Sequence, residues 1–213
     1  MTIDPMLRLH RWLSPAYPVG GFAYSHGIEA AVADGRIGDA ASAEAWITDI
    51  LRHGAGWNDA LLMAAAYHAS AEEVAEIGGL CAALASSAGR LLETEKQGHA
   101  FAATTAAVEG LDLPPMPYPV AVGRAVRLAD LPLDAALRLY LMAFASALTS
   151  AAIRLVPLGQ TDGQRILAAA EPLSADLAEA AADGDLDRLG SAAFLVDIAG
   201  MRQGALTTRL FRS

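Results

Sequence analysis

Apolar positions recur every three or four residues along almost the whole chain of 213 residues, and charged or small polar residues fill the positions between them. This period is typical of helices that bury one face. In residues 39–53, for example, Ala43, Ile47, Ile50 and Leu51 fall on one side of a helix. Strand patterns are nearly absent, because no sustained alternation of β-branched residues is joined by an Asn-Gly or Asp-Gly turn. The sequence therefore predicts an all-α, single-domain bundle of about eight to ten helices.

Capping residues, glycines and prolines set the expected helix boundaries. Asn58, the Ser70–Glu73 pair and the Thr161–Gln164 pair are expected to cap three helices. The expected helices cover residues 6–13, 26–34, 39–53, 58–69, 70 onwards, 87–111, 120–127, 133–156 and 161 onwards, and the region of Pro172 and Gly184 is expected to interrupt the last part of the chain.

Residues 112–119, DLPPMPYP, break the helical pattern most strongly. Proline removes a backbone donor and biases the preceding residue away from helix. Because neither half of the chain shows its own complete pattern of core and caps, we expect a rigid joint inside one domain that covers residues 1–213. A flexible C-terminal tail is expected at about residues 202–213.

Composition narrows the function classes. Hydrophobic residues make up 54% of the chain and charged residues 18%, so the protein has apolar surface for a partner or a second copy to cover. The net charge of −9 argues against nucleic acid as a partner, because phosphate binding needs a basic footprint. The longest uncharged stretch, residues 139–153, is shorter than the roughly 20 residues that cross a bilayer, so we expect a buried core helix and no membrane span. The single cysteine, Cys81, has no internal disulfide partner, which agrees with a reducing cytoplasm.

Nucleotide-binding and catalytic motifs do not stand out. Lys96, the only lysine, lacks the glycine-rich frame of a P-loop, and Gly20-Gly21 lacks the third glycine of a dinucleotide-binding turn. Ser25 and His26 are neighbours in sequence, and neighbours in a helix point about 100° apart, so they do not face each other as nucleophile and base. The sequence therefore predicts no catalytic and no cofactor-binding residue.

Ionisable side chains also fall short of a recognisable site. Three acidic residues of one long helix are interpreted as its solvated face rather than as an acid–base pair: Glu93, Glu95 and Glu109. The five histidines have no pair three or four residues apart and no cysteine at ligand spacing: His10, His26, His53, His68 and His99. We therefore expect solvated or hydrogen-bonded histidines and no metal site. A site assembled from distant residues, or across a symmetric interface, stays open.

Three stretches carry residues that folding alone explains poorly. Residues 14–31, SPAYPVGGFAYSHGIEAA, gather glycines and aromatics that suit either a recognition surface or packing onto the protein's own core. Residues 154–164, RLVPLGQTDGQ, join a helix end to a helix start, whose exposed backbone and amide groups suit a partner loop. Residues 207–213, TTRLFRS, place Leu-Phe between arginines, a composition that favours docking into a partner over a frayed tail.

Together these stretches resemble the UreF family of urease accessory proteins. The resemblance runs in order through SPAYPVGGFAYSHGIEAAVADG, ETEKQGHAFA, YPVAVG, AIRLVPLGQTDGQ and RLFRS, and so spans nearly the whole chain. It implies an all-helical, cytoplasmic, non-enzymatic chaperone that forms a homodimer, binds the accessory protein UreD (UreH in some species) and recruits the GTPase UreG. It also implies that this complex delivers nickel to the urease apoprotein, whose active-site lysine is carbamylated. Nickel is then handled by the complex, and no intrinsic cofactor is expected.

The resemblance places the candidate partner-binding residues in the same three stretches. They are Pro18, Gly20, Gly21, Phe22, Tyr24, Arg154, Pro157, Leu158, Gly159, Gln160, Gln164, Arg209, Leu210, Phe211 and Arg212, with Leu155 and Ser213 also matching the family motifs. The resemblance suggests that the tail becomes ordered when UreD binds. Family members often carry a His-Glu pair and a tyrosine where this chain has Gln203, Gly204 and Thr207, which removes a titratable, metal-capable pair.

Two other hypotheses stay open. In one, the adaptor regulates the GTPase cycle of UreG, for example by donating an arginine in trans, although the sequence singles out no arginine for that role. In the other, the protein is a helical enzyme or small-molecule-binding protein with a site between its helices. The apolar helix offers that site only a few hydroxyls, which we expect to bond to the helix's own carbonyls: Tyr140, Ser146, Thr149 and Ser150.

Overall fold

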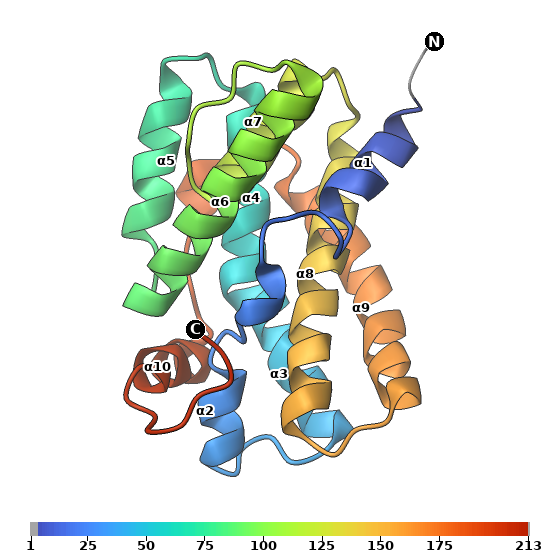
Figure 1. Ribbon diagram of the computed structural model, residues 1–213, viewed down its shortest axis with the longest axis vertical. Coiled ribbons are helices and arrows are strands. Elements are labelled where there is room, and N and C mark those ends of the chain that lie inside the picture. The colour runs from blue at the N-terminus through green and yellow to red at the C-terminus, as the bar shows by residue number, and fades with distance from the viewer. Residues whose placement is uncertain (1–3, 213) are drawn as a thin grey trace.

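The computed structural model describes residues 4–212, and within that range it contains ten α-helices, two short 3-10 helices and no strand (Figure 1). The all-α prediction is therefore confirmed. The helices are α1 (Pro5–Leu13), α2 (Ile28–Ala33), α3 (Ala40–His53), α4 (Ala55–His68), α5 (Glu73–Ala83), α6 (Ala88–Glu109), α7 (Tyr118–Leu128), α8 (Leu133–Leu155), α9 (Gln160–Ala181) and α10 (Phe194–Gln203), and the 3-10 helices are η1 (Gly21–Ala23) and η2 (Leu186–Arg188).

Helix α4 lies at the centre of the bundle and is buried along most of its length. It packs against α7 and α5 on one side and against α3, α8 and α9 on the other, while α6 covers α7. In Figure 1 the green α6 crosses in front of this centre, and α8 and α9 stand side by side at the right. One continuous core joins side chains from all of these helices, and its largest fully buried members include Trp12, Phe101, Leu61, Leu62, Met63 and Leu137.

Two glycines allow the closest helix contacts in this core. A β-carbon at Gly123 of α7 would lie 2.1 Å from the carbonyl oxygen of Met63 in α4. A β-carbon at Gly98 of α6 would lie 2.0 Å from the carbonyl oxygen of Met116, in the segment that leads into α7. Both distances are far below van der Waals contact, so any larger residue would push these backbones apart.

Most expected boundaries are confirmed. Ser87 caps α6, its hydroxyl accepting a hydrogen bond from the Arg90 amide at 3.1 Å. Ser70 and Glu73 form the expected reciprocal box, because the Ser70 amide donates to the Glu73 carboxylate at 2.8 Å and the Glu73 amide to the Ser70 hydroxyl at 3.3 Å. The Pro-rich segment leads without helix into α7, which begins at Tyr118. The division of the chain into domains stays a prediction.

Four of the expected boundary residues are wrong. Asn58 does not cap α4, which begins at Ala55; its side-chain oxygen instead accepts from the Gly190 amide at 3.0 Å. Thr161 and Gln164 lie inside α9, whose first turn is closed by Asp162 accepting from the Gly159 amide at 3.2 Å. Pro172 also lies inside α9 and does not interrupt it. Around Pro172 the buried Ala170 and Leu173 pack against the bundle, and this packing outweighs the local signal.

Among the described residues one helix, α8, is long and apolar enough to cross a membrane, with a mean hydropathy of 1.5 over its most apolar window. Half of that window, 50%, is buried inside the protein. The helix packs against α1, α3, α4 and α9, as a core helix of a bundle does. Its outer half carries apolar side chains that are only partly covered, among them Met142 and Phe144.

Candidate partner-binding site

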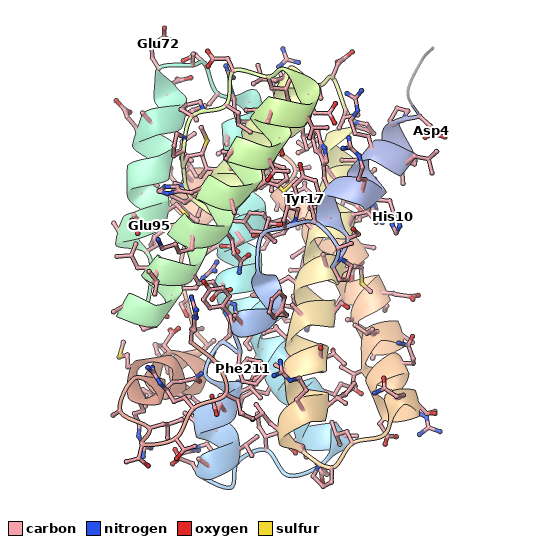
Figure 2. All side chains as sticks on the ribbon, in the orientation of Figure 1. Asp4, His10, Tyr17, Glu72, Glu95 and Phe211 are labelled. Carbon is pink, nitrogen blue, oxygen red and sulfur yellow. The ribbon has the colours of Figure 1, made fainter. Side chains whose placement is uncertain are left out.

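The N-terminal loop, residues 14–27, combines buried and exposed aromatics. Tyr17 and Tyr24 are 7% and 5% exposed, and the Tyr17 hydroxyl lies 2.8 Å from the Thr105 hydroxyl of α6. Figure 2 labels Tyr17 between α1 and α6. Phe22, in contrast, is 73% exposed. The two interpretations of this loop therefore apply to different residues: the tyrosines pack it onto the core, and Phe22 faces solvent.

A buried polar pair holds the end of this loop against α6. His26 has a positive φ of 51°, and its Nε2 atom lies 2.8 Å from Oε1 of Glu93. The Gln97 amide donates to the same oxygen at 3.0 Å. Glu93 is only 3% exposed, so its assignment to a solvated face is wrong. Glu95 does lie at the outer edge of α6 in Figure 2.

A second charged cluster lies beside the first. Arg90 of α6 donates to both oxygens of Asp59 in α4, at 2.8 and 2.6 Å, and the Tyr140 hydroxyl of α8 donates to Asp59 at 2.8 Å. Burial lowers the pKa of Arg90, but Asp59 and Glu93 raise it by more, so the guanidinium stays charged. Burial and the Asp59 charge raise the pKa of Tyr140 well above its ordinary value, so the phenol stays protonated. Tyr140 therefore bonds to a side chain, not to a helix carbonyl as expected.

A cavity of about 230 Å³ separates the N-terminal loop from α6 and α8. Its lining combines both charged clusters with aromatic rings, and includes Asp59, Arg90, Glu93, His26, Tyr118 and Phe144. Polar groups of this kind in a concave site are what a small-molecule site uses to orient a ligand.

The C-terminal tail folds back onto the N-terminal loop and α2. Glu29 of α2 accepts hydrogen bonds from two successive backbone amides of the tail, Leu210 at 2.7 Å and Phe211 at 3.0 Å. The Arg212 amide donates to the carbonyl of Ala23 at 2.8 Å. Figure 1 shows the red tail leaving α10 and ending beside the blue N-terminal loop, and Figure 2 places Phe211 between α2, α8 and α10.

Arg154, at the end of α8, joins the tail to the loop. Its guanidinium lies 4.6 Å from the centre of the Phe211 ring, a cation–π contact, and it donates to the carbonyl of Phe22 at 3.4 Å. Phe211 is 3% exposed, whereas Leu210 is 62% exposed. The structure therefore brings together the candidate residues of the loop, Arg154 and the tail.

The remaining candidate residues lie elsewhere. Residues 157–160 and Gln164 form the turn between α8 and α9 and the first turn of α9, at the lower end of the molecule in Figure 1. Within residues 4–212 none of them hydrogen-bonds the tail. Ser213, which closes the last motif, lies outside the described residues.

Sequence reasoning missed two parts of this surface. Glu29 was not singled out, because a lone carboxylate in a short helix carries no pattern. The outer face of α10 was missed as well, although its apolar residues recur at helical spacing: Phe194, Leu195, Ile198 and Met201 are 70%, 53%, 50% and 61% exposed. That spacing at the end of a chain was the available signal, since an apolar stripe next to a docking motif indicates a shared surface.

The structure shows where the three residues that depart from the family pattern lie: Gln203, Gly204 and Thr207. Gln203 is 1% exposed, and its side-chain amide donates to the Ser25 hydroxyl at 2.9 Å and to Glu29 at 3.5 Å. Gly204 and Thr207 are exposed in the tail. Within the described residues no group of three or more His, Cys, Asp or Glu side chains is arranged to hold a metal ion.

These features define a class of protein: an all-helical bundle in which the C-terminal tail packs onto the loop before α2, with an apolar helix face beside it. Comparison with known proteins agrees. The UreF family model matches residues 37–171. Urease accessory protein UreF of Cereibacter sphaeroides is 51% identical over 208 residues, covering 98% of both chains. The proteins of the same name from Ruegeria pomeroyi and Jannaschia sp. are 49% and 44% identical, over 100% and 98% of this chain and 98% and 94% of their own. The chain belongs to the UreF family.

Proposed function

We propose that this protein is a non-enzymatic adaptor in urease maturation. It binds the accessory protein UreD (UreH) and the GTPase UreG, and this complex delivers nickel to the urease apoprotein. Two findings support the proposal: the relatives are named urease accessory proteins, and the tail, the N-terminal loop and α10 form one surface with unburied apolar side chains. The second finding carries it, because a soluble bundle gains nothing by exposing these side chains unless a partner covers them.

The composition of this surface suits a protein partner. Aromatic and arginine side chains are enriched at the centres of protein interfaces, and here Phe194 of α10, Leu210, Arg209 and Arg212 of the tail and Phe22 of the N-terminal loop are all exposed. We assign this surface to UreD. The GTPase then joins the UreD-bound complex, and its hydrolysis of GTP is modulated there.

A second surface is proposed for the homodimer. The outer face of α8 is apolar and only half covered, and self-association is the commonest way for a soluble chain to cover such a face.

Cys81 is unpaired and buried, and burial with the Asp59 charge raises the pKa of its thiol to about 12, so it persists as an inert thiol. This agrees with the proposed cytoplasmic location.

The test uses two apolar side chains of matched exposure. Leu210 of the tail is 62% exposed and Val108 of α6 is 59% exposed. Leu210→Asp is expected to abolish co-purification with co-expressed UreD, because it places a charge in the interface, while Val108→Asp leaves co-purification intact. Equal recovery of UreD by both variants would remove the proposed surface. Failure of the unsubstituted chain to recover UreD would remove the adaptor function itself.

The cavity supports a second candidate function, that of a helical small-molecule-binding protein or enzyme. The observation that favours this function is the cavity of about 230 Å³, which is lined by buried charged side chains. A ligand present at 100 times its dissociation constant stabilises a protein by about 2.7 kcal/mol, which a thermal shift across a metabolite panel detects. The shift is expected to vanish in Ser146→Phe, which fills the cavity that Ser146 lines. A panel without any shift argues against this candidate.

A further inference from the structure

Glu29 is a buried carboxylate that accepts hydrogen bonds from backbone amides of the tail. It is 8% exposed, and within residues 4–212 no arginine, lysine or histidine forms an ion pair with it. A buried carboxylate without a cationic partner is stabilised only when hydrogen-bond donors surround it. Here the donors are the Leu210 and Phe211 amides and the Gln203 side chain. When the tail leaves, Glu29 loses its principal donors and must be rehydrated.

The geometry of these bonds fixes which side chain of the tail faces outward. Each carboxylate oxygen takes one of two successive amides, Oε1 from Leu210 and Oε2 from Phe211. Successive side chains of an extended segment point to opposite sides, so one is buried when the other is exposed. Phe211 accordingly packs inward below Arg154, and Leu210 faces solvent.

The same carboxylate also anchors the start of the tail. Gln203 bonds both to Glu29 and to Ser25, so residues 204–209 form a loop whose two ends meet at one site. The adjoining helices approach closely there, because a β-carbon at Gly27 would lie 2.7 Å from the Gly200 amide nitrogen of α10. The tail, α10 and α2 are thus held in one arrangement around Glu29.

We propose that Glu29 is the positioning residue of the partner surface: it holds the tail in the register that buries Phe211 and presents Leu210 beside α10. Its effect on partner affinity rests on the function proposed above. Its effect on the tail does not, and the two are measured separately.

The first measurement is amide hydrogen exchange by NMR in Glu29→Gln, which keeps the side chain's size but removes its charge and one acceptor. The Leu210 and Phe211 amides are expected to exchange at least tenfold faster, while the amides of α4 keep their rates. Glu44→Gln, at an exposed position of α3, is the matched control and changes neither. Unchanged exchange at Leu210 and Phe211 would overturn the proposal. Faster exchange throughout the core would also overturn it, because Glu29 would then be an ordinary structural residue.

The second measurement is the affinity for UreD. Glu29→Gln is expected to weaken binding at least tenfold, because the tail that presents Leu210 is then no longer held in register. A tail that exchanges faster with unaltered affinity for UreD would refute the positioning role. If UreD fails to bind even the unsubstituted chain, the adaptor function fails, and the exchange rates alone decide whether Glu29 holds the tail.

Discussion

The buried pair of Asp59 and Arg90 permits a quantitative prediction. Asp59 is 4% exposed and receives two hydrogen bonds from Arg90, at 2.8 and 2.6 Å, together with one from Tyr140. Asp59→Asn removes the charge and leaves the guanidinium facing only Glu93, at 3.6 Å. Removing one partner of a buried ion pair costs about 3–5 kcal/mol, because the remaining charge is left without compensation. For a chain of this length, about 2–4 °C of melting temperature is lost per kcal/mol, so the melting temperature should fall by roughly 6–20 °C.

The double variant tests the reason for that loss. Arg90→Met alone is expected to cost a similar amount, because it strands the carboxylate instead. Asp59→Asn with Arg90→Met should cost clearly less than the sum of the two single changes, because neither charge of the Asp59–Arg90 pair is then left facing a neutral side chain. The free energies of unfolding are measured by urea denaturation of all four proteins.

An exposed pair of the same chemistry provides the comparison. Asp134 and Arg138 lie one turn apart on α8, with side chains 61% and 42% exposed. Asp134→Asn should cost no more than about 0.5 kcal/mol, since solvent screens such pairs. Additive losses in the double variant, or equal losses at Asp59 and Asp134, would refute the argument that burial makes the first pair essential.

Three further predictions concern the site and its surroundings. Gly27→Ala should destabilise the protein by about 1–3 kcal/mol in urea denaturation and speed hydrogen exchange in α10. Gly35→Ala is the control, because Gly35 has a similar φ of 72° but no atom within 4 Å of its β-carbon, and it should leave exchange in α10 unaffected. Equally fast exchange in both variants would point to backbone strain alone. The free energy of unfolding should be highest below about pH 9 and fall as the pH rises further. Burial raises the pKa of Tyr140 above 10.0 and the pKa of Cys81 to about 12, so the unfolded chain loses these two protons at lower pH than the folded protein does, and each group adds a slope of about 1.4 kcal/mol per pH unit. A urea midpoint that stays constant from pH 8 to 11 would contradict this. Phe211→Ala should speed hydrogen exchange in the tail while the melting temperature changes little. The lost packing of about 3–5 kcal/mol destabilises the docked tail relative to the detached tail, and not the bundle itself. A large fall in melting temperature would show that the tail belongs to the core.

The fold was predictable from the sequence because helical spacing of apolar residues is repeated in nearly every segment. Helix starts were less predictable. Asn58 looks like a cap, yet the helix begins at Ala55, because the apolar face of α4 is buried from its first turn. Pro172 looks like a stop, but the flanking residues Ala170 and Leu173 are buried against the bundle, and this packing outweighs one lost hydrogen bond.

The site was predictable in part. The closing motif marked Phe211 and Arg212, and the apolar helix end marked Arg154, which the structure joins to them. The buried carboxylates were not predictable, since pattern analysis assigns a charge to solvent by default. Glu93 and Glu29 are buried because partners distant in the sequence reach them, His26 in one case and the tail in the other. Such pairings depend on the tertiary fold and leave no local signal.

The most direct test of the adaptor surface is the affinity of UreD for a chain that ends at Gln203. This truncation removes the docking tail but keeps the bonds of Gln203 to Ser25 and Glu29, so α10 stays in place. We expect the shortened protein to retain its helical circular dichroism and its melting temperature within a few degrees, and to lose measurable binding to UreD. Binding of the shortened chain with the affinity of the full chain would contradict the account.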